Sequence, residues 1–250
     1  MLDIVYRSAD LLAIDKASGV SLLADRSGAP CLWETLVEEL ALEGHEPFSV
    51  HRIDKGTSGV LLVALTRERQ SHLSQAFARR DVRKFYVARV VGDVRLDGVS
   101  GLIDLPLEKG RKSRFRVAAP RERIVRHGSR WHLTGRTSAG HESLSRLRRI
   151  GGDGRQTLLL LQPLTGRTHQ LRVHLSWIGH PIVGDHLYGK PDSVEQQWPR
   201  LALHCHRVVV DGVAITAPLP AEFALPAARH PAAGRRETRG SRGRTTRQRK

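Results

Sequence analysis

A run of six consecutive apolar residues, from Val60 to Leu65, constrains the fold more than any other stretch of the chain. A continuous apolar run of this length is typical of a strand that is buried on both faces. The segment directly before it, residues 51–59, is polar and ends in a Thr-Ser-Gly turn. The sequence therefore predicts a polar loop held by a rigid strand, and loops of this kind often carry functional groups.

Shorter patterns on both sides of this run predict a mixture of strands and helices. A helix is expected over Thr168–Ile178, with Thr168 as its cap and with Gly179 and Pro181 ending it. Strands and helices do not alternate regularly, so the predicted fold class is α+β rather than a doubly wound sheet. The other predicted strands cover residues 4–6, 11–14, 20–23, 84–91, 158–161 and 208–210, and further helices lie around residues 33–40 and 73–77.

The chain is strongly basic, because its 41 lysines and arginines exceed its 25 acidic residues and give a formal charge of +16. This excess favours a polyanionic partner such as nucleic acid, with a basic solvated surface as the alternative. Half of the charge falls in residues 227–250, where nine basic residues stand against one acid and apolar periodicity is lost. We therefore expect one domain over residues 1–226 and a disordered basic tail over residues 227–250.

Several protein classes are disfavoured. Cys31 and Cys205 are too few for a disulfide framework and lack the clustering of a zinc site, so no metal is predicted. No glycine-rich phosphate loop follows a strand, so no nucleotide cofactor is indicated. The first residues lack a secretory signal pattern, and no segment is long and apolar enough to span a membrane. These features predict a soluble, cytoplasmic protein.

Asp54 is the first candidate for chemistry. It lies in the polar loop between two cations, Arg52 and Lys55. Nearby cations favour the charged form of a carboxyl group, so we expect Asp54 to be ionised. An ionised carboxylate can act as a nucleophile toward a sugar carbon or a base. Most loop aspartates, however, only stabilise turns, and that interpretation is favoured when this loop is considered alone.

A second candidate segment runs from Thr165 to His174. On the predicted helix, His169 and Arg172 are three residues apart and share one face, which can look out over a ligand or simply over solvent. His169 and His174 are five residues apart, not the four that would bring two metal ligands to one helical face. A metal site is therefore not predicted here.

Several segments, taken in chain order, resemble the motifs of the RluA family of RNA pseudouridine synthases. His51–Leu62 is similar to the family motif that carries the catalytic aspartate, and Lys84–Ala88 resembles the motif with an active-site tyrosine. Thr165–Leu175 with residues 179–185 and 188–189 resembles the third motif, and Arg200–His204 resembles the stretch before the late strand. The resemblance extends from about residue 4 to residue 223, and several long motifs in order are specific to the family.

The resemblance implies the pseudouridine synthase catalytic fold, a mixed and mainly antiparallel sheet flanked by helices and loops. It also implies a single catalytic domain, because the residues before the first motif leave no room for the S4 RNA-binding module of many members. The chain departs from the family pattern at Asp15-Lys16-Ala17, where Asn-Lys-Pro is frequent, and at Ser143 and Ser145, where Ala and Thr are usual. These departures bear mainly on packing.

The implied activity is the isomerisation of uridine to pseudouridine in structured RNA, either large-subunit ribosomal RNA, tRNA or both, with no cofactor and no metal. Asp54 would attack the ribose or the base, Tyr86 would pack against the base, and Arg172 would hold Asp54 by an ion pair. The resemblance also implies that Arg52 would enter the space left by the flipped uridine, and a planar guanidinium can stack and hydrogen-bond in such a gap. Further RNA contacts are expected from His51, Arg167 and His169.

Two other functions are considered beside this one. A noncatalytic RNA-binding or ribosome-assembly factor could have the same fold, but it would not need the combination of Asp54, Tyr86 and Arg172. An enzyme that cleaves the glycosidic bond without rejoining it would release free uracil. For the synthase we expect RNA as the partner and a monomer as the active form.

Overall fold

The structure is a computed structural model, and it describes residues 2–24, 28–112, 114–135, 137–190 and 197–224. Its elements follow one another along the chain as β1 (Ile4–Arg7), β2 (Leu11–Lys16), α1 (Leu32–Ala41), β3 (Phe48–Ser49), β4 (Ser58–Ala64), α2 (Arg67–Ala78), β5 (Arg83–Val91), β6 (Gly101–Asp104), β7 (Leu107–Lys109), β8 (Phe115–Val117), η1 (Arg121–Arg123), β9 (Ile124–His127), β10 (Arg130–Leu133), β11 (Leu144–Gly152), β12 (Gln156–Pro163), α3 (Gln170–Trp177), β13 (Leu203–Val210), β14 (Val213–Thr216) and η3 (Ala221–Phe223).

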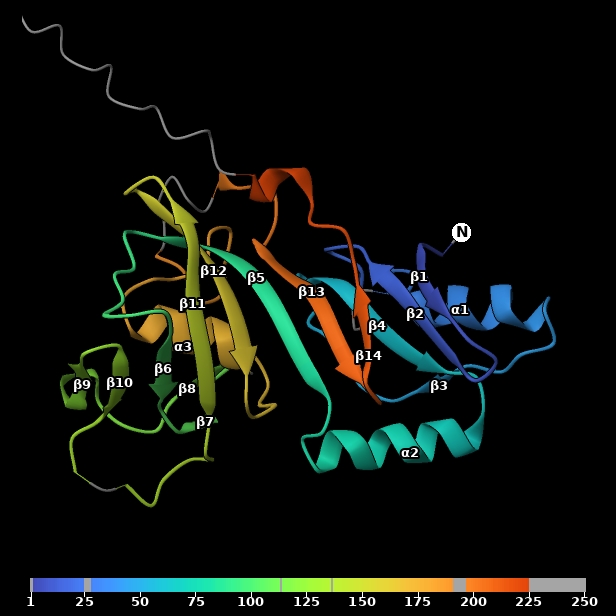
Figure 1. The fold of residues 1–250 in the computed structure, drawn as a ribbon, viewed down its shortest axis with the longest axis horizontal. Helices are drawn as coiled ribbons and strands as arrows, with labels where there is room; N and C mark the ends of the chain where they lie inside the picture. The colour runs from blue at the N-terminus through green and yellow to red at the C-terminus, as the bar shows by residue number, and fades with distance from the viewer. Residues whose placement is uncertain (1, 25–27, 113, 136, 191–196, 225–250) are drawn as a thin grey trace, which may run out of the picture.

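Twelve of these strands form one continuous sheet that runs across the molecule (Figure 1). The strand order is β1-β2-β4-β13-β5-β12-β11-β6-β10-β9, with β14 beside β13 and β3 beside β4. The pairs β13–β4 and β10–β6 are parallel, whereas the long central pairs β5–β12, β11–β12 and β5–β13 are antiparallel. The α+β class and the mixed, mainly antiparallel sheet are therefore confirmed.

Helices pack against this sheet at two places. Helices α1 and α2 lie beside the end that holds β1 to β4, and α3 lies beside β11 and β12 (Figure 1). Leu36 and Leu40 on the apolar stripe of α1 pack in one cluster with Leu61 and Val63 of β4. The amphipathic patterns around residues 33–40 and 73–77 thus predicted real helices, although Val37 on the predicted stripe of α1 is exposed.

The strand β4 is buried along its whole length, as its apolar run predicts. Its side chains alternate between the α1 cluster and the larger core, and its edges pair with β2 and β13. Gly59 has φ +107°, and a Cβ there would lie 2.3 Å from the carbonyl oxygen of Cys205. Only glycine lets β13 approach so closely, and this contact fixes the end of β4 that adjoins the Asp54 loop.

Two local predictions are wrong. Residues 20–23 are not a strand, because the carbonyl groups of Ser21 and Leu22 accept hydrogen bonds from Leu32 and Trp33 at the start of α1. Thr168 does not cap α3. The helix begins at Gln170, and its cap position is held by His169 in the left-handed region. The first prediction fails because of a tertiary contact with α1, and the second because the left-handed backbone of His169 takes the cap position. Neither feature leaves a periodic signal in the sequence.

Two further expectations concern the C-terminal tail and membrane-spanning helices. The predicted basic tail, residues 227–250, lies outside the described residues, so the domain boundary at residue 226 stays a prediction. Within the described ranges, no helix has both the length and the apolar character needed to cross a lipid bilayer.

Candidate active site

The loop that carries Asp54 is anchored to the loop that follows β2. The ammonium group of Lys16, which is 1% exposed, donates a hydrogen bond of 3.2 Å to the carbonyl of Lys55. The Ser18 hydroxyl donates one of 2.6 Å to the carbonyl of Gly56. Burial lowers the pKa of Lys16 to about 8, although the charge of Asp54 acts in the opposite direction. The backbone next to Asp54 is thus held from outside its own loop.

His51 anchors the other side of the loop. Its Nε2 atom accepts a hydrogen bond of 2.9 Å from the backbone amide of Leu62, and its ring lies 4.8 Å from the ring of Phe77. Burial lowers the pKa of His51 to about 3, so the ring is neutral. The ring nitrogen that faces Leu62 is occupied by the protein itself, and an RNA contact by His51 stays a prediction.

Arg172 of α3 faces Asp54 but is bonded chiefly to another carboxylate. Its Nε and Nη2 atoms donate hydrogen bonds of 2.9 and 2.8 Å to the two oxygens of Asp185, whose side chain is fully buried. Its Nη1 atom lies 3.5 Å from Oδ2 of Asp54. Asp185 also accepts hydrogen bonds from the amides of Leu187 and Tyr188. The guanidinium is therefore fixed by Asp185 and leaves one edge toward Asp54.

His169 approaches the same carboxylate from the turn before α3. It has φ +57°, which is unfavourable for a residue with a side chain, and its Nε2 lies 3.9 Å from Oδ1 of Asp54. Its Nδ1 is 2.9 Å from the hydroxyl of Tyr188, which accepts a hydrogen bond from the amide of Phe115. The hydroxyl can then donate its proton to Nδ1, so that Nε2–H faces Asp54. Burial lowers the pKa of His169, against the charge of Asp54.

These groups line a cavity of about 120 Å³. Tyr86 is 7% exposed on its wall, and burial raises the pKa of its phenol, which is therefore neutral. Arg52 and Arg167 are exposed residues that also line this cavity. A wider groove of about 710 Å³ shares Asp54, His169 and Arg172 with the cavity, and His51 lines the groove. A small pocket at the edge of a broad groove suits one base turned out of a longer strand.

The structure thus gathers six of the seven predicted site residues around one cavity, and it sets His51 in the adjoining groove. The six are Arg52, Asp54, Tyr86, Arg167, His169 and Arg172. Within the described ranges, no group of three potential ligands is placed to hold a metal ion.

Other residues of the site were not assigned a role from the sequence. Lys84 lines the cavity, and burial lowers its pKa against the charge of Asp54. Asp185 orients Arg172, and Tyr188 orients His169. All three lie within or beside the segments that resemble family motifs, so their positions carried a signal. The contacts that these residues make carried no such signal, because each contact joins residues that are far apart in the sequence or on different elements.

Comparison with known proteins identifies the family of this chain. Residues 10–177 match the family model described as RNA pseudouridylate synthase. The chain is 33% identical over 208 residues to the dual-specificity RNA pseudouridine synthase RluA of Yersinia pestis, covering 83% of this chain and 91% of that protein. It is 31% identical over 226 residues to the protein of the same name from Salmonella typhi, covering 89% and 94%.

Solved structures show the same relationship. Human RNA pseudouridylate synthase domain containing 1 superposes with a TM-score of 0.70 at 28% identity, covering 90% of this chain and 85% of that chain. Human RNA pseudouridylate synthase domain containing 4 has a TM-score of 0.71 at 23% identity, covering 88% and 90%, and shows the fold alone. With most of its length aligned to these proteins, the chain belongs to the RNA pseudouridylate synthase family.

Proposed function

We propose that Asp54 is the nucleophile with which this RNA pseudouridine synthase isomerises uridine. The observation that carries the proposal is the position of its carboxylate, which lies at the cavity, 3.5 Å from the Arg172 guanidinium. At that distance the cation stabilises the negative charge, and the carboxylate oxygens can still reach a substrate atom.

The reaction conserves all atoms. Asp54 attacks the nucleoside at the ribose or at the base, and the bond between N1 and the ribose breaks. The base then turns within the cavity and C5 joins the ribose. The bond between Asp54 and the nucleoside breaks, which frees the carboxylate, the proton on C5 leaves, and N1 gains a proton. Tyr86 packs against the base as it turns and can move a proton, because its buried phenol is neutral. Arg172 holds the Asp54 carboxylate by an ion pair and aims it at the nucleoside.

Arg52 is the residue that we assign to the gap left in the RNA. Turning a base out of a stacked strand costs a few kcal/mol. Arg52 is exposed beside Asp54 and lines both the cavity and the groove, so its planar guanidinium can stack in the vacated space. Arg167 and His169, which also line the cavity, would contact the RNA.

For the substrate we propose large-subunit ribosomal RNA, tRNA or both. The relatives from Yersinia pestis and Salmonella typhi carry the words dual-specificity in their names, which supports more than one RNA substrate. Pseudouridine mapping of total RNA from cells with and without the gene would identify the positions. We expect the enzyme to act in the cytoplasm as a monomer.

A separate proposal concerns the basic tail. We propose that residues 229–250 add nonspecific affinity for RNA phosphates, because this segment is rich in arginine. A truncated protein should then bind RNA more weakly and with a smaller dependence on salt concentration. Unchanged, salt-dependent binding by the truncated protein would rule this role out.

The catalytic proposal is tested with purified protein and a uridine-containing RNA. The wild type should form pseudouridine and release no free uracil, whereas a glycosidase would release it. The Asp54→Asn variant should bind the same RNA and form no pseudouridine. Wild-type protein that binds RNA without modifying it would instead favour a noncatalytic binding factor.

A further inference from the structure

A buried network of polar side chains connects α3 to β11 and to the turn over residues 165–169. Its members are Ser145, Thr165, Gln170 and His174, and all are between 0% and 4% exposed. None of them takes part in the chemistry proposed above. Buried polar side chains that are fully bonded usually fix one local arrangement, so the network invites the question of what it fixes.

The direction of each hydrogen bond follows from the backbone groups at the two ends of the network. Nε2 of His174 lies 2.9 Å from the carbonyl of Leu105, which can only accept, so Nε2 carries the proton. Nδ1 therefore accepts from the Ser145 hydroxyl at 2.9 Å. Burial lowers the pKa of His174 to about 4, which agrees with a neutral ring. The Ser145 oxygen is left to accept from another donor.

Gln170 supplies that donor and is the centre of the network. Its Nε2 donates to the Ser145 hydroxyl at 3.0 Å and to the carbonyl of Leu144 at 2.8 Å. Its Oε1 accepts from the Thr165 hydroxyl at 2.7 Å and from the amide of Arg167 at 3.0 Å. One side chain thus bonds to β11 with its amino group and to the turn with its oxygen.

The turn held in this way leads directly to His169. His169 occupies the cap position of α3 in a left-handed conformation and makes no capping hydrogen bond with its side chain. The side chain of the next residue, Gln170, bonds instead to the backbone of Arg167 and to Thr165. The network therefore fixes the backbone at the start of α3 on both sides of His169. A strained residue keeps its conformation only where the surrounding structure holds it there.

We propose that Gln170 is a positioning residue, which, together with Thr165, fixes the turn so that His169 and Arg172 face Asp54. This proposal rests on the assigned role of Asp54. His169 and Arg172 lie 3.9 and 3.5 Å from the Asp54 carboxylate, and a shift of about 1 Å at such a site can slow a reaction about a hundredfold. Loss of the network should therefore reduce the rate of the bound complex more than the affinity for RNA.

The chain contains a matched control at the other end of β12. The hydroxyl of Thr165 accepts from the amide of Leu144 at 2.9 Å and donates to Gln170 at 2.7 Å. The hydroxyl of Thr157 accepts from the amide of Val94 at 2.9 Å and donates to the carbonyl of Gly92 at 2.7 Å. Both threonines are buried, so removal of either hydroxyl breaks a similar pair of hydrogen bonds.

The experiment compares Thr165→Val with Thr157→Val and with the conservative variant Thr165→Ser. Single-turnover rates of pseudouridine formation are measured at saturating enzyme, together with the dissociation constant of the RNA. Thr165→Val should slow the saturated rate by about tenfold or more with little change in RNA affinity. Thr165→Ser, which keeps the hydroxyl, should restore the rate, and Thr157→Val should leave it unchanged.

Two results would overturn the proposal. One is an equal loss of rate in both valine variants, which would mean a general effect of a lost buried hydrogen bond. The other is a Thr165→Val protein that reacts as fast as the wild type. Gln170→Glu provides a second variant, because it keeps the shape but cannot donate to Leu144 and Ser145. If Asp54→Asn also stayed active, the assigned role of Asp54 would fail instead, and that outcome is separately visible.

Discussion

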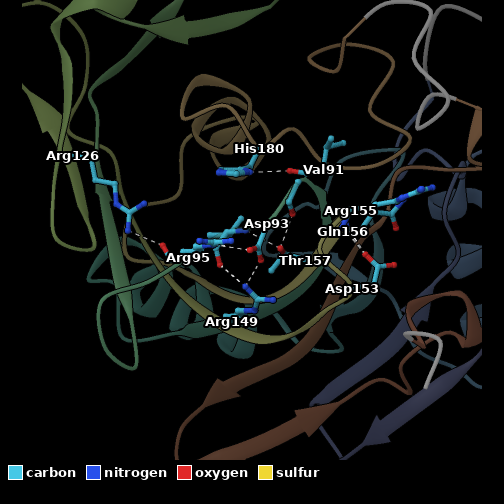
Figure 2. Close-up of polar contacts among 12 residues, drawn as sticks. Val91, Asp93, Arg95, Arg126, Arg149, Asp153, Arg155, Gln156, Thr157 and His180 are labelled. Carbon is cyan, nitrogen blue, oxygen red and sulfur yellow. Dashed lines mark hydrogen bonds and ion pairs between the residues drawn. The ribbon is translucent and has the colours of Figure 1, made fainter. Parts of the chain in front are cut away.

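Two carboxylates of this protein face cations in very different ways. Asp54 lies at the cavity with Arg172 at 3.5 Å and His169 at 3.9 Å. Asp93 follows the end of β5 and is held by Arg95 at 2.8 Å and by a close contact with Arg149 (Figure 2). Their side chains are almost equally accessible, 27% exposed for Asp54 and 26% for Asp93. Accessibility therefore does not distinguish them, but bonding does.

The difference shows what a reactive carboxylate requires. Both oxygens of Asp93 are bonded to arginines, and these hydrogen bonds lower its pKa. Asp185, the buried partner of Arg172, is likewise saturated, by Arg172 and two backbone amides. Asp54 has Arg172 and His169 within reach, but at distances longer than a hydrogen bond. A saturated carboxylate orients its neighbours, whereas a loosely held one can attack a substrate.

The largest effect is expected from removing Arg172, which contacts both the saturated Asp185 and the loosely held Asp54. Arg172→Gln leaves Asp185 buried without its cation, which should destabilise the fold by about 3 kcal/mol. It also removes the cation beside Asp54, so the reaction of the remaining folded protein should slow by about a hundredfold or more. Urea unfolding and single-turnover kinetics measure the two effects.

Arg89→Gln is the control for that loss of stability. Arg89 is also buried, but it bonds to Gln156 and to the backbone of Glu222 and Ala224 rather than to the cavity. It should destabilise the protein while the folded fraction keeps its normal rate. An Arg172→Gln protein that matched Arg89→Gln in rate would contradict the link between Arg172 and Asp54.

Tyr86→Phe sharpens the comparison on the wall of the cavity. The ring stays in place to pack against a base, but the neutral hydroxyl is lost. If the phenol moves a proton, the saturated rate should fall by about a hundredfold while RNA affinity is retained. Pseudouridine formation by Tyr86→Phe at the wild-type rate would restrict Tyr86 to packing.

Acid should weaken the fold through buried histidines. The pKa values of His51, His174 and His204 are lowered to about 3, 4 and 4, mainly by burial. Between pH 6.5 and 4 the unfolded chain therefore binds protons that the folded chain does not, so the free energy of unfolding falls as the pH falls. Urea unfolding at pH 7.5 and pH 5 checks this, and equal stability at both values would contradict it.

The smallest effect is expected at the exposed edge of the Asp93 cluster. Arg95 is 83% exposed, and exposed ion pairs contribute little to stability. Arg95→Gln should leave the rate of pseudouridine formation unchanged and should hardly change the unfolding midpoint. A clear loss of activity would mean that the contacts of Asp93 with Arg95 and Arg149 affect the cavity, and would contradict a purely structural role for them.

The sequence was most informative where the signal was local. The apolar run from Val60 to Leu65 predicted the buried strand β4, and amphipathic stripes predicted α1 and α2. The family motifs, and not the properties of the single residues, linked Tyr86 and Arg172 to Asp54. The ion pair of Arg172 with Asp185 and the network around Gln170 were not predicted, because they depend on how separate elements pack. The strained backbone of His169 also has no signature in the sequence.

The most direct test exchanges the two carboxylates for amides in parallel. Asp54→Asn and Asp93→Asn are compared for the single-turnover rate at saturating RNA and for the free energy of unfolding in urea. The account predicts that Asp54→Asn abolishes the rate with little loss of stability, and that Asp93→Asn lowers stability with the rate intact. Substantial activity in Asp54→Asn, or a lost rate in Asp93→Asn, would contradict it.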